Sequence, residues 1–225
     1  RVRSRAAEEV VCEVMHSPCP EVVLTGINIS AYSCDGKGLA DLLGMLADTD
    51  KRIRLGSIEC NVIDEKLLSA CKTLKNFAPQ FHLSLQSGSD AVLKKMNRRY
   101  TRAEYLEKCA LIYKFFPDAA ITTDIIAGFP GETDEDFCDS LSIIEEAGLA
   151  RVHAFAFSPR EGTVAFKMKD TPHDIKEARL HKLLAAGRAA EEKYISRFIG
   201  TVRSVIFEDT EGEYTAGYTP NYIKV

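Results

Sequence analysis

Two stretches of this sequence combine an apolar run with polar groups that could hold a ligand. Residues His82–Asp90 pass from an apolar strand into Gln-Ser-Gly-Ser, and Thr122–Thr133 place Asp124 in an apolar run that ends in Gly-Phe-Pro-Gly-Glu. Both read as strands that break into polar and glycine residues before a helix begins. In folds of alternating strands and helices, the loops after the strands gather at one face and form the active site. The two stretches therefore predict a ligand-binding mouth.

Three more predicted strands also end in hydrogen-bonding residues, so we expect the ends of all five predicted strands to contribute to this mouth. Asp124 is the most notable of these groups, because a carboxylate inside an apolar strand needs a partner or a ligand. None of the five histidines has the Ser or Cys context of a nucleophile elbow, so we expect a mouth that binds while the reactive centre comes from elsewhere. The side chains expected to point into one shared hollow are Asn28, Glu59, Gln86, Asp124 and Arg160.

The elements that position these groups alternate between strands and helices, which predicts an α/β fold with parallel strands and right-handed crossovers. Five strands are too few to close an eight-stranded barrel, so we expect an open partial (β/α) barrel. A flat doubly wound sheet is the competing fold, but no Gly-x-Gly-x-x-Gly fingerprint supports it. The predicted strands are Glu21–Ile27, Arg52–Ile58, Phe81–Ser87, Ala120–Phe129 and Arg151–Ser158, and the predicted helices are Ser4–His16, Gly38–Ala47, Asp64–Phe77, Thr101–Phe116 and Thr133–Ala147.

After the fifth strand the pattern changes. A long helix is predicted over Pro172–Phe198, followed by strands Thr201–Glu208 and Tyr214–Val225 with a turn at Asp209–Gly212. A lone hairpin is marginally stable in water, so it must lean on the barrel. We therefore expect two domains, a partial barrel with its long helix over residues 1–199 and the start of a small β module over residues 200–225.

The composition excludes several classes of protein. No run approaches the roughly 18 apolar residues that a membrane span requires, and the basic start leads into no apolar signal core, so we expect a cytoplasmic protein. The net charge of −4 argues against a uniformly basic nucleic-acid binder, although basic clusters occur at residues 1–5 and 94–102. The seven cysteines are scattered, which indicates reduced thiols and no local metal site.

Six runs of residues, taken together, closely resemble the radical S-adenosylmethionine (SAM) methylthiotransferases, and the resemblance extends over nearly the whole chain. The runs are Arg1-Val2-Arg3-Ser4-Arg5, Val23-Leu24-Thr25-Gly26-Ile27-Asn28, Leu83-Ser84-Leu85-Gln86-Ser87-Gly88-Ser89-Asp90, Met96-Asn97-Arg98-Arg99-Tyr100-Thr101, Asp124-Ile125-Ile126-Ala127-Gly128-Phe129-Pro130-Gly131-Glu132-Thr133 and Ser158-Pro159-Arg160-Glu161-Gly162-Thr163.

The resemblance implies cofactors and a missing part. In that family three cysteines of a C-x-x-x-C-x-x-C loop hold a [4Fe-4S] cluster shortly before the Arg-Ser-Arg run, and a second [4Fe-4S] cluster belongs to an N-terminal domain. Here the chain begins at the Arg run, so we expect a fragment that lacks both cluster sites and is inactive alone. Its end resembles the start of the family's RNA-binding TRAM module. In the implied reaction, a 5′-deoxyadenosyl radical from SAM removes hydrogen from C2 of a tRNA adenine, and a methylated sulfur replaces it.

The resemblance also implies roles for residues of the predicted mouth. Arginines near the mouth suit planar anions such as phosphate or carboxylate. The residues expected to bind SAM are Thr25, Gly26, Asn28, Ser57, Glu59, Gln86, Ser87, Asp124, Ile126, Gly128 and Pro130, and those expected to bind the substrate are Arg98, Arg99, Ser158 and Arg160.

Within the family, the chain looks most like the branch that modifies N6-threonylcarbamoyladenosine beside the tRNA anticodon. Its Thr25-Gly26-Ile27-Asn28 run departs from the Gly-Gln-Asn run of the isopentenyladenosine branch. The implied partners are the tRNA anticodon stem-loop and an electron donor protein. Three alternatives stay open, namely the isopentenyladenosine branch, a non-catalytic RNA- or nucleotide-binding module, and a metal-independent barrel enzyme that uses Asp124 as a base.

Overall fold

A computed structural model describes residues 3–211 and 214–225 of the chain. Arg1 and Val2 of the basic start, and Gly212 of the predicted turn, lie outside these residues. The chain forms two compact units, one built from Arg1–His82, Leu111–Ala120 and Gly200–Val225 and the other from Leu83–Ala110 and Ile121–Ile199. The domain boundary expected after residue 199 stays a prediction.

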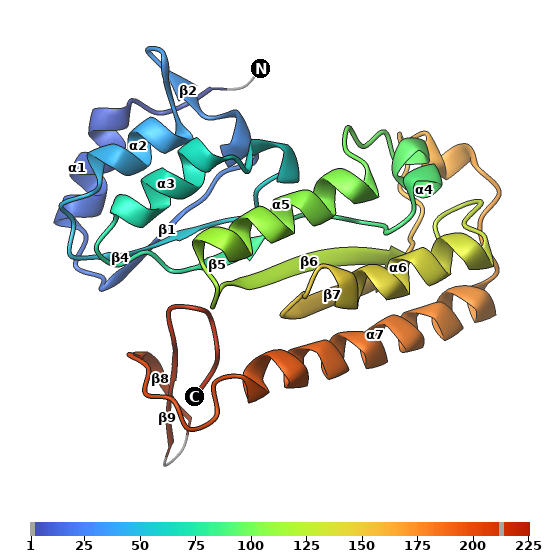
Figure 1. Cartoon of the computed structure of the whole chain (residues 1–225). Helices are drawn as coiled ribbons and strands as arrows, with labels where there is room; N and C mark the ends of the chain where they lie inside the picture. Colours follow the sequence, from blue (N-terminus) through green and yellow to red (C-terminus); the bar gives the residue numbers. More distant parts are fainter. Residues whose placement is uncertain (1–2, 212–213) are drawn as a thin grey trace. The chain divides into compact units, whose positions relative to one another are not determined.

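The first unit contains a parallel pair of strands with helices beside it (Figure 1). β1 (Glu21–Leu24) pairs with β4 (Arg52–Leu55), and β5 (Gln80–His82) follows, with its His82 carbonyl accepting from the Ile58 amide at 3.0 Å. A short hairpin that the sequence analysis did not predict, β2 (Ser33–Cys34) and β3 (Lys37–Gly38), precedes α2. The helices are α1 (Ala7–His16), α2 (Leu39–Met45) and α3 (Glu65–Thr73).

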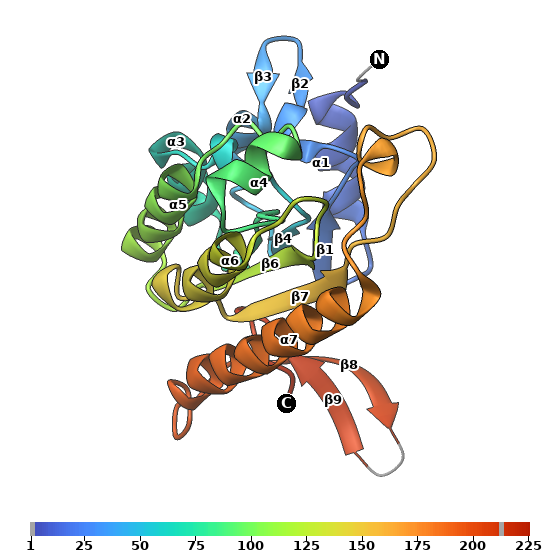
Figure 2. The same cartoon turned by 90° about the vertical axis from the view of Figure 1, so that its right-hand side faces the viewer.

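The second unit contains the parallel pair β6 (Ala120–Ala127) and β7 (Arg151–Ala156). Its helices are α4 (Asp90–Lys95), which the sequence analysis missed, α6 (Asp134–Glu146) and α7 (His173–Ser196), and α5 (Arg102–Phe115) begins in this unit. α7 runs along β7 in both views (Figures 1 and 2). A Cβ on Gly187 of α7 would lie 3.3 Å from the Val152 side chain, so the missing side chain lets helix and strand pack closely.

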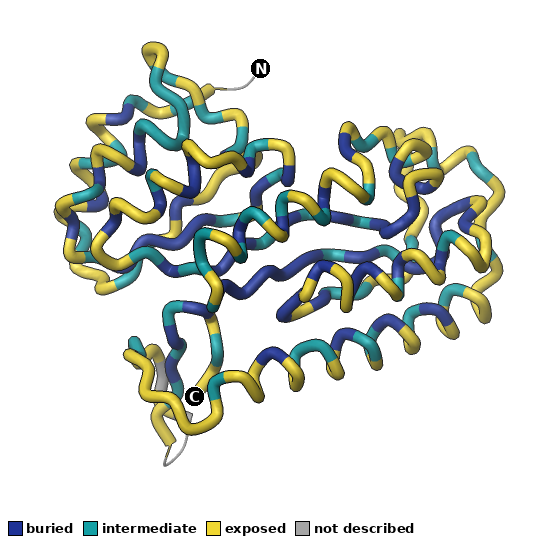
Figure 3. Tube along the Cα trace, viewed as in Figure 1, coloured by how far each residue is buried: buried dark blue, intermediate teal, exposed yellow. Residues whose placement is uncertain are grey.

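The strand β6 is buried over most of its length and is more open only towards its carboxyl end (Figure 3). Thr123, Ile125 and Ala127 are buried, whereas Asp124 and Ile126 are half-buried. Successive side chains of a strand point to opposite faces, so Asp124 and Ile126 share one face, the open face of β6. The register of the pair places His153 of β7 beside Asp124. The open face therefore carries residues that the sequence analysis expects to bind a ligand.

The observed elements follow the predicted order, and most are shorter at their ends. The predicted strand Phe81–Ser87 differs most, because the regular strand ends at His82. Just beyond it, the buried Thr123 hydroxyl accepts from the Leu85 amide at 3.0 Å and donates to the Leu83 carbonyl. A side chain thus takes the place of ladder hydrogen bonds, and no sequence pattern shows such a replacement.

The predicted C-terminal hairpin forms, and its strands pair antiparallel. β8 (Ile206–Glu211) begins later than the predicted strand Thr201–Glu208, and β9 (Tyr214–Tyr218) ends earlier than the predicted strand Tyr214–Val225. The predicted turn was wrong at its start, because residues 209–211 belong to β8. The expectation that the hairpin leans on the rest of the protein is confirmed within the first unit. Arg52 donates to the Tyr218 carbonyl at 3.0 Å, and the Arg203 guanidinium lies 2.9 Å from the Asp118 carboxylate.

Two predicted helix starts are confirmed. The Thr101 amide donates to the Glu104 carboxylate at 2.7 Å, and the Glu104 amide donates to the Thr101 hydroxyl at 3.2 Å, which completes a capping box. Thr133 and Asp136 form the same arrangement at the start of α6. Across residues 3–211 and 214–225, no helix is both long enough and apolar enough to cross a membrane.

Candidate functional site

The ends of β1 and β4 form a polar edge in the first unit. Because the two strands are parallel, their carboxyl ends lie side by side, and the Gly56 amide donates to the Leu24 carbonyl at 2.8 Å. A Cβ on Gly56 would lie 3.0 Å from the hydroxyl oxygen of Thr25, so the strand ends approach closely. The residues exposed at this edge include Thr25, Gly26, Asn28 and Ser57. Their hydroxyl and amide groups suit a polar ligand.

Asn28 and Glu59 also have local structural roles at this edge. The Asn28 side-chain oxygen accepts from the Ala31 amide at 3.2 Å and starts the 3₁₀ turn η1 (Ile29–Ala31). The backbone amide of the half-buried Glu59 donates to the Ser30 hydroxyl at 2.9 Å. This bond ties the loop after β4 to the loop after β1.

In the second unit, Gln86 lies directly beside Asp124 and Ile126. The Gln86 amide donates to the Asp124 carbonyl at 2.8 Å, and the Gln86 carbonyl accepts from the Ile126 amide at 2.9 Å. Gln86 has a φ of 75°, in the left-handed region that residues other than glycine rarely adopt. Such strain persists only where the surroundings impose it, and it gathers at functional sites. Gln86 is therefore the expected cofactor residue with the most unusual local geometry.

Ser87 and Gly88 face α6. Ser87 is fully buried, with its hydroxyl 3.3 Å from that of Ser140, and the Gly88 amide donates to the Ser140 hydroxyl at 2.9 Å. A Cβ on Gly88 would lie only 2.4 Å from the Asp139 carbonyl oxygen. These contacts with Ser140 anchor the segment directly after Gln86 to α6. Direct contact of Ser87 with a cofactor stays a prediction.

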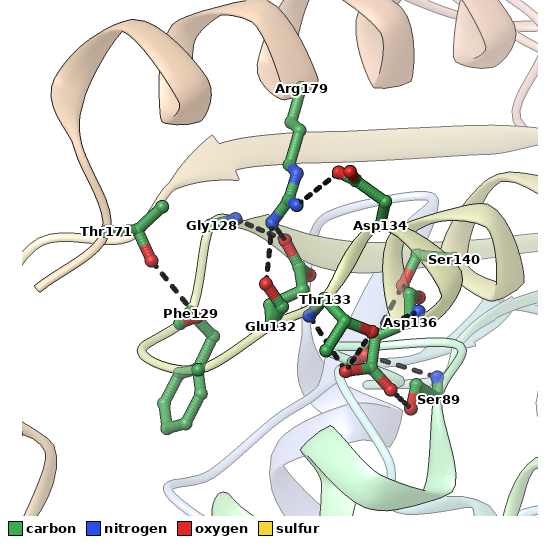
Figure 4. Close-up of polar contacts among 12 residues, drawn as sticks. Ser89, Gly128, Phe129, Glu132, Thr133, Asp134, Asp136, Ser140, Thr171 and Arg179 are labelled. Atoms are coloured by element: carbon green, nitrogen blue, oxygen red, sulfur yellow. Dashed lines mark hydrogen bonds and ion pairs between the residues drawn. The ribbon is translucent and has the colours of Figure 1, made fainter.

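The loop after β6 is closed by a buried carboxylate (Figure 4). Glu132 Oε2 accepts from the Gly128 amide at 2.8 Å, and Arg179 of α7 donates to the same oxygen at 2.7 Å. Gly128 and Gly131 have φ values of 72° and 76°, which favour glycine. The two residues of this loop expected to bind the cofactor, Gly128 and Pro130, are both buried.

Burial raises the pKa of Glu132 above its ordinary value, while the hydrogen bond from Gly128 and the charge of Arg179 act in the opposite direction. The Glu132 side chain is 0% exposed, and its Oε1 has no hydrogen-bond partner among the residues that the structure describes. The sequence analysis missed Arg179, since nothing in the composition of the long helix distinguishes this arginine from its neighbours.

Asp136 at the start of α6 should make the free energy of unfolding depend on pH. Burial acts to raise its pKa, but hydrogen bonds from the Ser89 hydroxyl and from the amide and hydroxyl of Thr133 outweigh burial and hold the pKa below 3.8. A lowered pKa stabilises the folded state above the unfolded-state pKa, and this stabilisation is lost as the pH falls through the folded-state pKa. Wild type should therefore lose its stability advantage over Asp136→Asn below about pH 4. Urea unfolding of both proteins between about pH 7 and pH 2 measures this, and an advantage that grows in acid contradicts it.

The four residues expected to bind the substrate lie in loops of the second unit. Arg98 and Arg99 follow α4 and precede Tyr100, whose hydroxyl donates to the Leu85 carbonyl at 2.8 Å next to Gln86. Ser158 and Arg160 follow β7, and in Figure 1 this loop and α4 lie near the carboxyl end of β6. Arg99, Ser158 and Arg160 are exposed, and Arg98 is half-buried.

The expected site residues thus form two sets, one in each unit. The proposal that the two sets share one hollow with Arg160 stays a prediction. The set in the first unit is Thr25, Gly26, Asn28, Ser57 and Glu59, and the set in the second is Gln86, Ser87, Asp124, Ile126, Gly128 and Pro130.

The cysteines do not fit an iron–sulfur cluster. A [4Fe-4S] cluster is held by thiolates that lie close together. Within residues 3–211 and 214–225, no three His, Cys, Asp or Glu side chains gather as a metal site. Cys60, Cys71 and Cys109 are buried, and burial raises the pKa of Cys71 to about 12, which keeps its thiol protonated. The polar edge of the first unit and the Gln86 segment, in contrast, suit the amino, carboxylate and hydroxyl groups of SAM.

Comparison with known proteins identifies the class of protein to which this fold and these strand ends belong. The sequence model of the Radical SAM superfamily matches residues 1–144, more than half of the chain. The chain therefore belongs to the radical SAM superfamily, whose members use SAM with an iron–sulfur cluster.

Within this superfamily, the chain is similar to tRNA methylthiotransferases. Threonylcarbamoyladenosine tRNA methylthiotransferase MtaB of Thermotoga maritima is 38% identical over 100% of this chain and 54% of that protein. tRNA-2-methylthio-N(6)-dimethylallyladenosine synthase of Bdellovibrio bacteriovorus is 38% identical over 95% of this chain and 49% of that protein. The chain thus spans about half the length of the curated relatives it matches. The resemblance to methylthiotransferases expected from the sequence is confirmed.

Two solved structures confirm the fold class. Coproporphyrinogen III oxidase (HemN) of Escherichia coli, a radical SAM enzyme, matches 68% of this chain and 36% of that chain with a TM-score of 0.54 and 18% identity. Elp3 of Methanocaldococcus infernus matches 75% of this chain and 44% of that chain with a TM-score of 0.51 and 14% identity. The parallel pairs β1–β4 and β6–β7 agree with an open partial barrel of the radical SAM type.

Proposed function

We propose that this chain is the radical SAM core of a tRNA methylthiotransferase that adds a 2-methylthio group to N6-threonylcarbamoyladenosine beside the anticodon. The observation that carries the proposal is the similarity of the whole chain to MtaB of Thermotoga maritima, at 38% identity. MtaB of Bacillus subtilis supports it, with 35% identity over 100% of this chain and 53% of that protein. The partners in this proposal are a tRNA anticodon stem-loop and an electron donor protein.

The residues of this chain serve binding and orientation. When bound, SAM supplies the radical chemistry, and the protein supplies its placement. The exposed groups of Thr25, Asn28 and Ser57 would hold the methionine and ribose portions. The strained Gln86 and the open-face residues Asp124 and Ile126 would flank the rest of the cofactor. Gly128 and Pro130 would border the adenine through their backbone.

One observation favours a second candidate, the isopentenyladenosine branch. The dimethylallyladenosine synthase of Bdellovibrio bacteriovorus has the same 38% identity as MtaB of Thermotoga maritima. The difference between the two candidates lies only in the adenosine that is modified, so the product in the cell distinguishes them.

Mass spectrometry of tRNA nucleosides from cells that lack the gene tests the function. We expect 2-methylthio-N6-threonylcarbamoyladenosine to disappear and its unmethylthiolated precursor to accumulate. Loss of the 2-methylthio-isopentenyl nucleoside instead would support the second candidate. Persistence of both nucleosides would contradict the methylthiotransferase function and leave a non-catalytic RNA-binding module.

The arginines near the mouth give a prediction for RNA binding. Arg99→Ala and Arg160→Ala should each weaken binding of an anticodon stem-loop RNA and lower the slope of log affinity against log salt by about 0.7 to 1, because each removes one phosphate contact. Fluorescence anisotropy titrations over a range of salt concentrations measure both quantities. The control is Lys193→Ala. Lys193 lies in the last turn of α7, and its ammonium group is 2.9 Å from the Glu145 carboxylate. Equal effects of all three substitutions would contradict the assignment.

A further inference from the structure

The first turns of α7 hold the loop after β6 through one buried arginine. Arg179 is 7% exposed and donates from Nη1 to both the carboxylate and the backbone carbonyl of Glu132, the latter at 3.1 Å. Its Nη2 donates to Asp134 at 2.7 Å (Figure 4). Its guanidinium carbon lies 5.4 Å from the ring centre of Phe137. Arg179 therefore fixes the end of the loop and the start of α6 together.

The same side of the loop is filled by other atoms around α7. A Cβ on Gly128 would lie 2.3 Å from Cγ of Lys176, so the Lys176 stem packs against the loop backbone. The Thr171 hydroxyl donates to the Phe129 carbonyl at 3.4 Å, and the rings of Phe129 and Phe157 meet edge to face at 5.2 Å. These contacts cover the side of the loop that faces α7.

A gain in stability does not by itself account for the buried ion pair between Glu132 and Arg179. Burying two charges removes their hydration, and an apolar pair of similar volume is often at least as stable. In addition, one Glu132 oxygen lacks a hydrogen-bond partner among the described residues. The ion pair does fix the orientation of the Glu132 carboxylate, because a planar guanidinium fixes the positions of the oxygens it binds. The oriented Glu132 carboxylate accepts the hydrogen bond from the Gly128 amide, and this bond joins the two ends of the loop formed by residues 128–132.

We propose that Glu132 and Arg179 are positioning residues that hold the loop Gly128–Glu132 in the shape that receives SAM. The inference rests on the proposed function, because it takes Gly128 and Pro130 to border that cofactor. Neither Glu132 nor Arg179 needs to contact SAM, since they act through the loop backbone.

The test compares SAM affinity, RNA affinity and loop protection in the full-length holoprotein. Arg179→Gln and Glu132→Gln should each weaken SAM binding about tenfold or more, because a ligand loses affinity when the groups around it are misplaced. Both should speed hydrogen exchange of the Gly128 amide, and neither should change the affinity for the anticodon stem-loop RNA. Arg179→Lys should not restore SAM affinity, because an ammonium cannot reproduce the planar fork.

Leu183→Ala is the matched control. Leu183 lies on α7 and is fully buried, so Leu183→Ala destabilises the packing of the helix while both partners of the ion pair between Arg179 and Glu132 remain. If Leu183→Ala lowers SAM affinity as much as the Arg179 and Glu132 variants do, the role is structural only and the proposal fails. If wild type binds SAM and the loop variants bind it equally well, the proposal fails while the proposed function stands. Failure of the wild-type holoprotein to bind SAM would overturn both.

Discussion

Arg54→Ala should lower the free energy of unfolding by about 3 kcal/mol, because it leaves the Glu21 carboxylate, only 14% exposed, with much of its charge unpaired. Arg54 is 5% exposed and donates to both oxygens of Glu21, at 2.8 and 3.1 Å. Its guanidinium also lies 4.4 Å from the ring centre of Tyr222, which stacks on Tyr218. The substitution therefore removes an ion pair and a support of the C-terminal segment at once.

Urea unfolding measures the loss of stability from Arg54→Ala, and hydrogen exchange at Thr219 and Val225 measures release of the C-terminal segment. Arg54→Met keeps the packing of the stem, so it separates packing from charge. The control is Lys75→Ala, which removes an exposed ion pair with Asp50 at 3.6 Å and should cost at most about 1 kcal/mol. Similar losses for Arg54→Ala and Lys75→Ala would show that the buried cluster contributes little.

Gly88→Ala should destabilise the second unit by roughly 3 kcal/mol, at the upper end for overpacking. The added Cβ would lie 2.4 Å from the Asp139 carbonyl oxygen and 2.7 Å from Cα of Ser140, and both are backbone atoms of α6 that cannot rotate away. The strand end must then separate from the helix, which shifts Gln86 as well. We therefore expect Gly88→Ala to weaken SAM binding in addition to lowering stability.

Thermal unfolding and SAM titration measure the two effects of Gly88→Ala. Gly44→Ala is the matched control, because a Cβ at Gly44 in α2 meets nothing within 4 Å. Alanine is the better helix former by about 1 kcal/mol, so this control should be neutral or more stable than wild type. If Gly88→Ala is as stable as Gly44→Ala, a side chain at position 88 does not clash with the backbone of α6, which would contradict this prediction.

The sequence predicted the order of the strands and the polar residues at their ends, because these follow from local periodicity and turn chemistry. Asp124, which the sequence analysis singled out as a carboxylate in an apolar strand, is half-buried in β6, as is Ile126. The short hairpin β2–β3 was missed although Asp35-Gly36, with φ values of 49° and 76°, carries the common signal for such a turn. That signal was present and was overlooked.

Other features have no local signal. The sequence Arg52-Ile53-Arg54-Leu55 reads as half polar, yet all four side chains are buried, because Glu21, 33 residues before Arg54, supplies the compensating charge. Arg179 meets Glu132 across 47 residues, and the Thr123 hydroxyl replaces ladder bonds of a segment 38 residues earlier. Partners this far apart in the chain become visible only when the fold brings them together, so neither the α7 contact nor the early end of β5 could be predicted from the sequence.

Hydrogen exchange of the full-length holoprotein with and without SAM is the most direct test of the central claim, which is that the strand-end residues predicted from the sequence bind SAM. We expect SAM to slow exchange both at Thr25–Asn28 and at the segments Gln86–Ser89 and Asp124–Gly131. Protection found only outside these segments, or no protection at all, would contradict the claim.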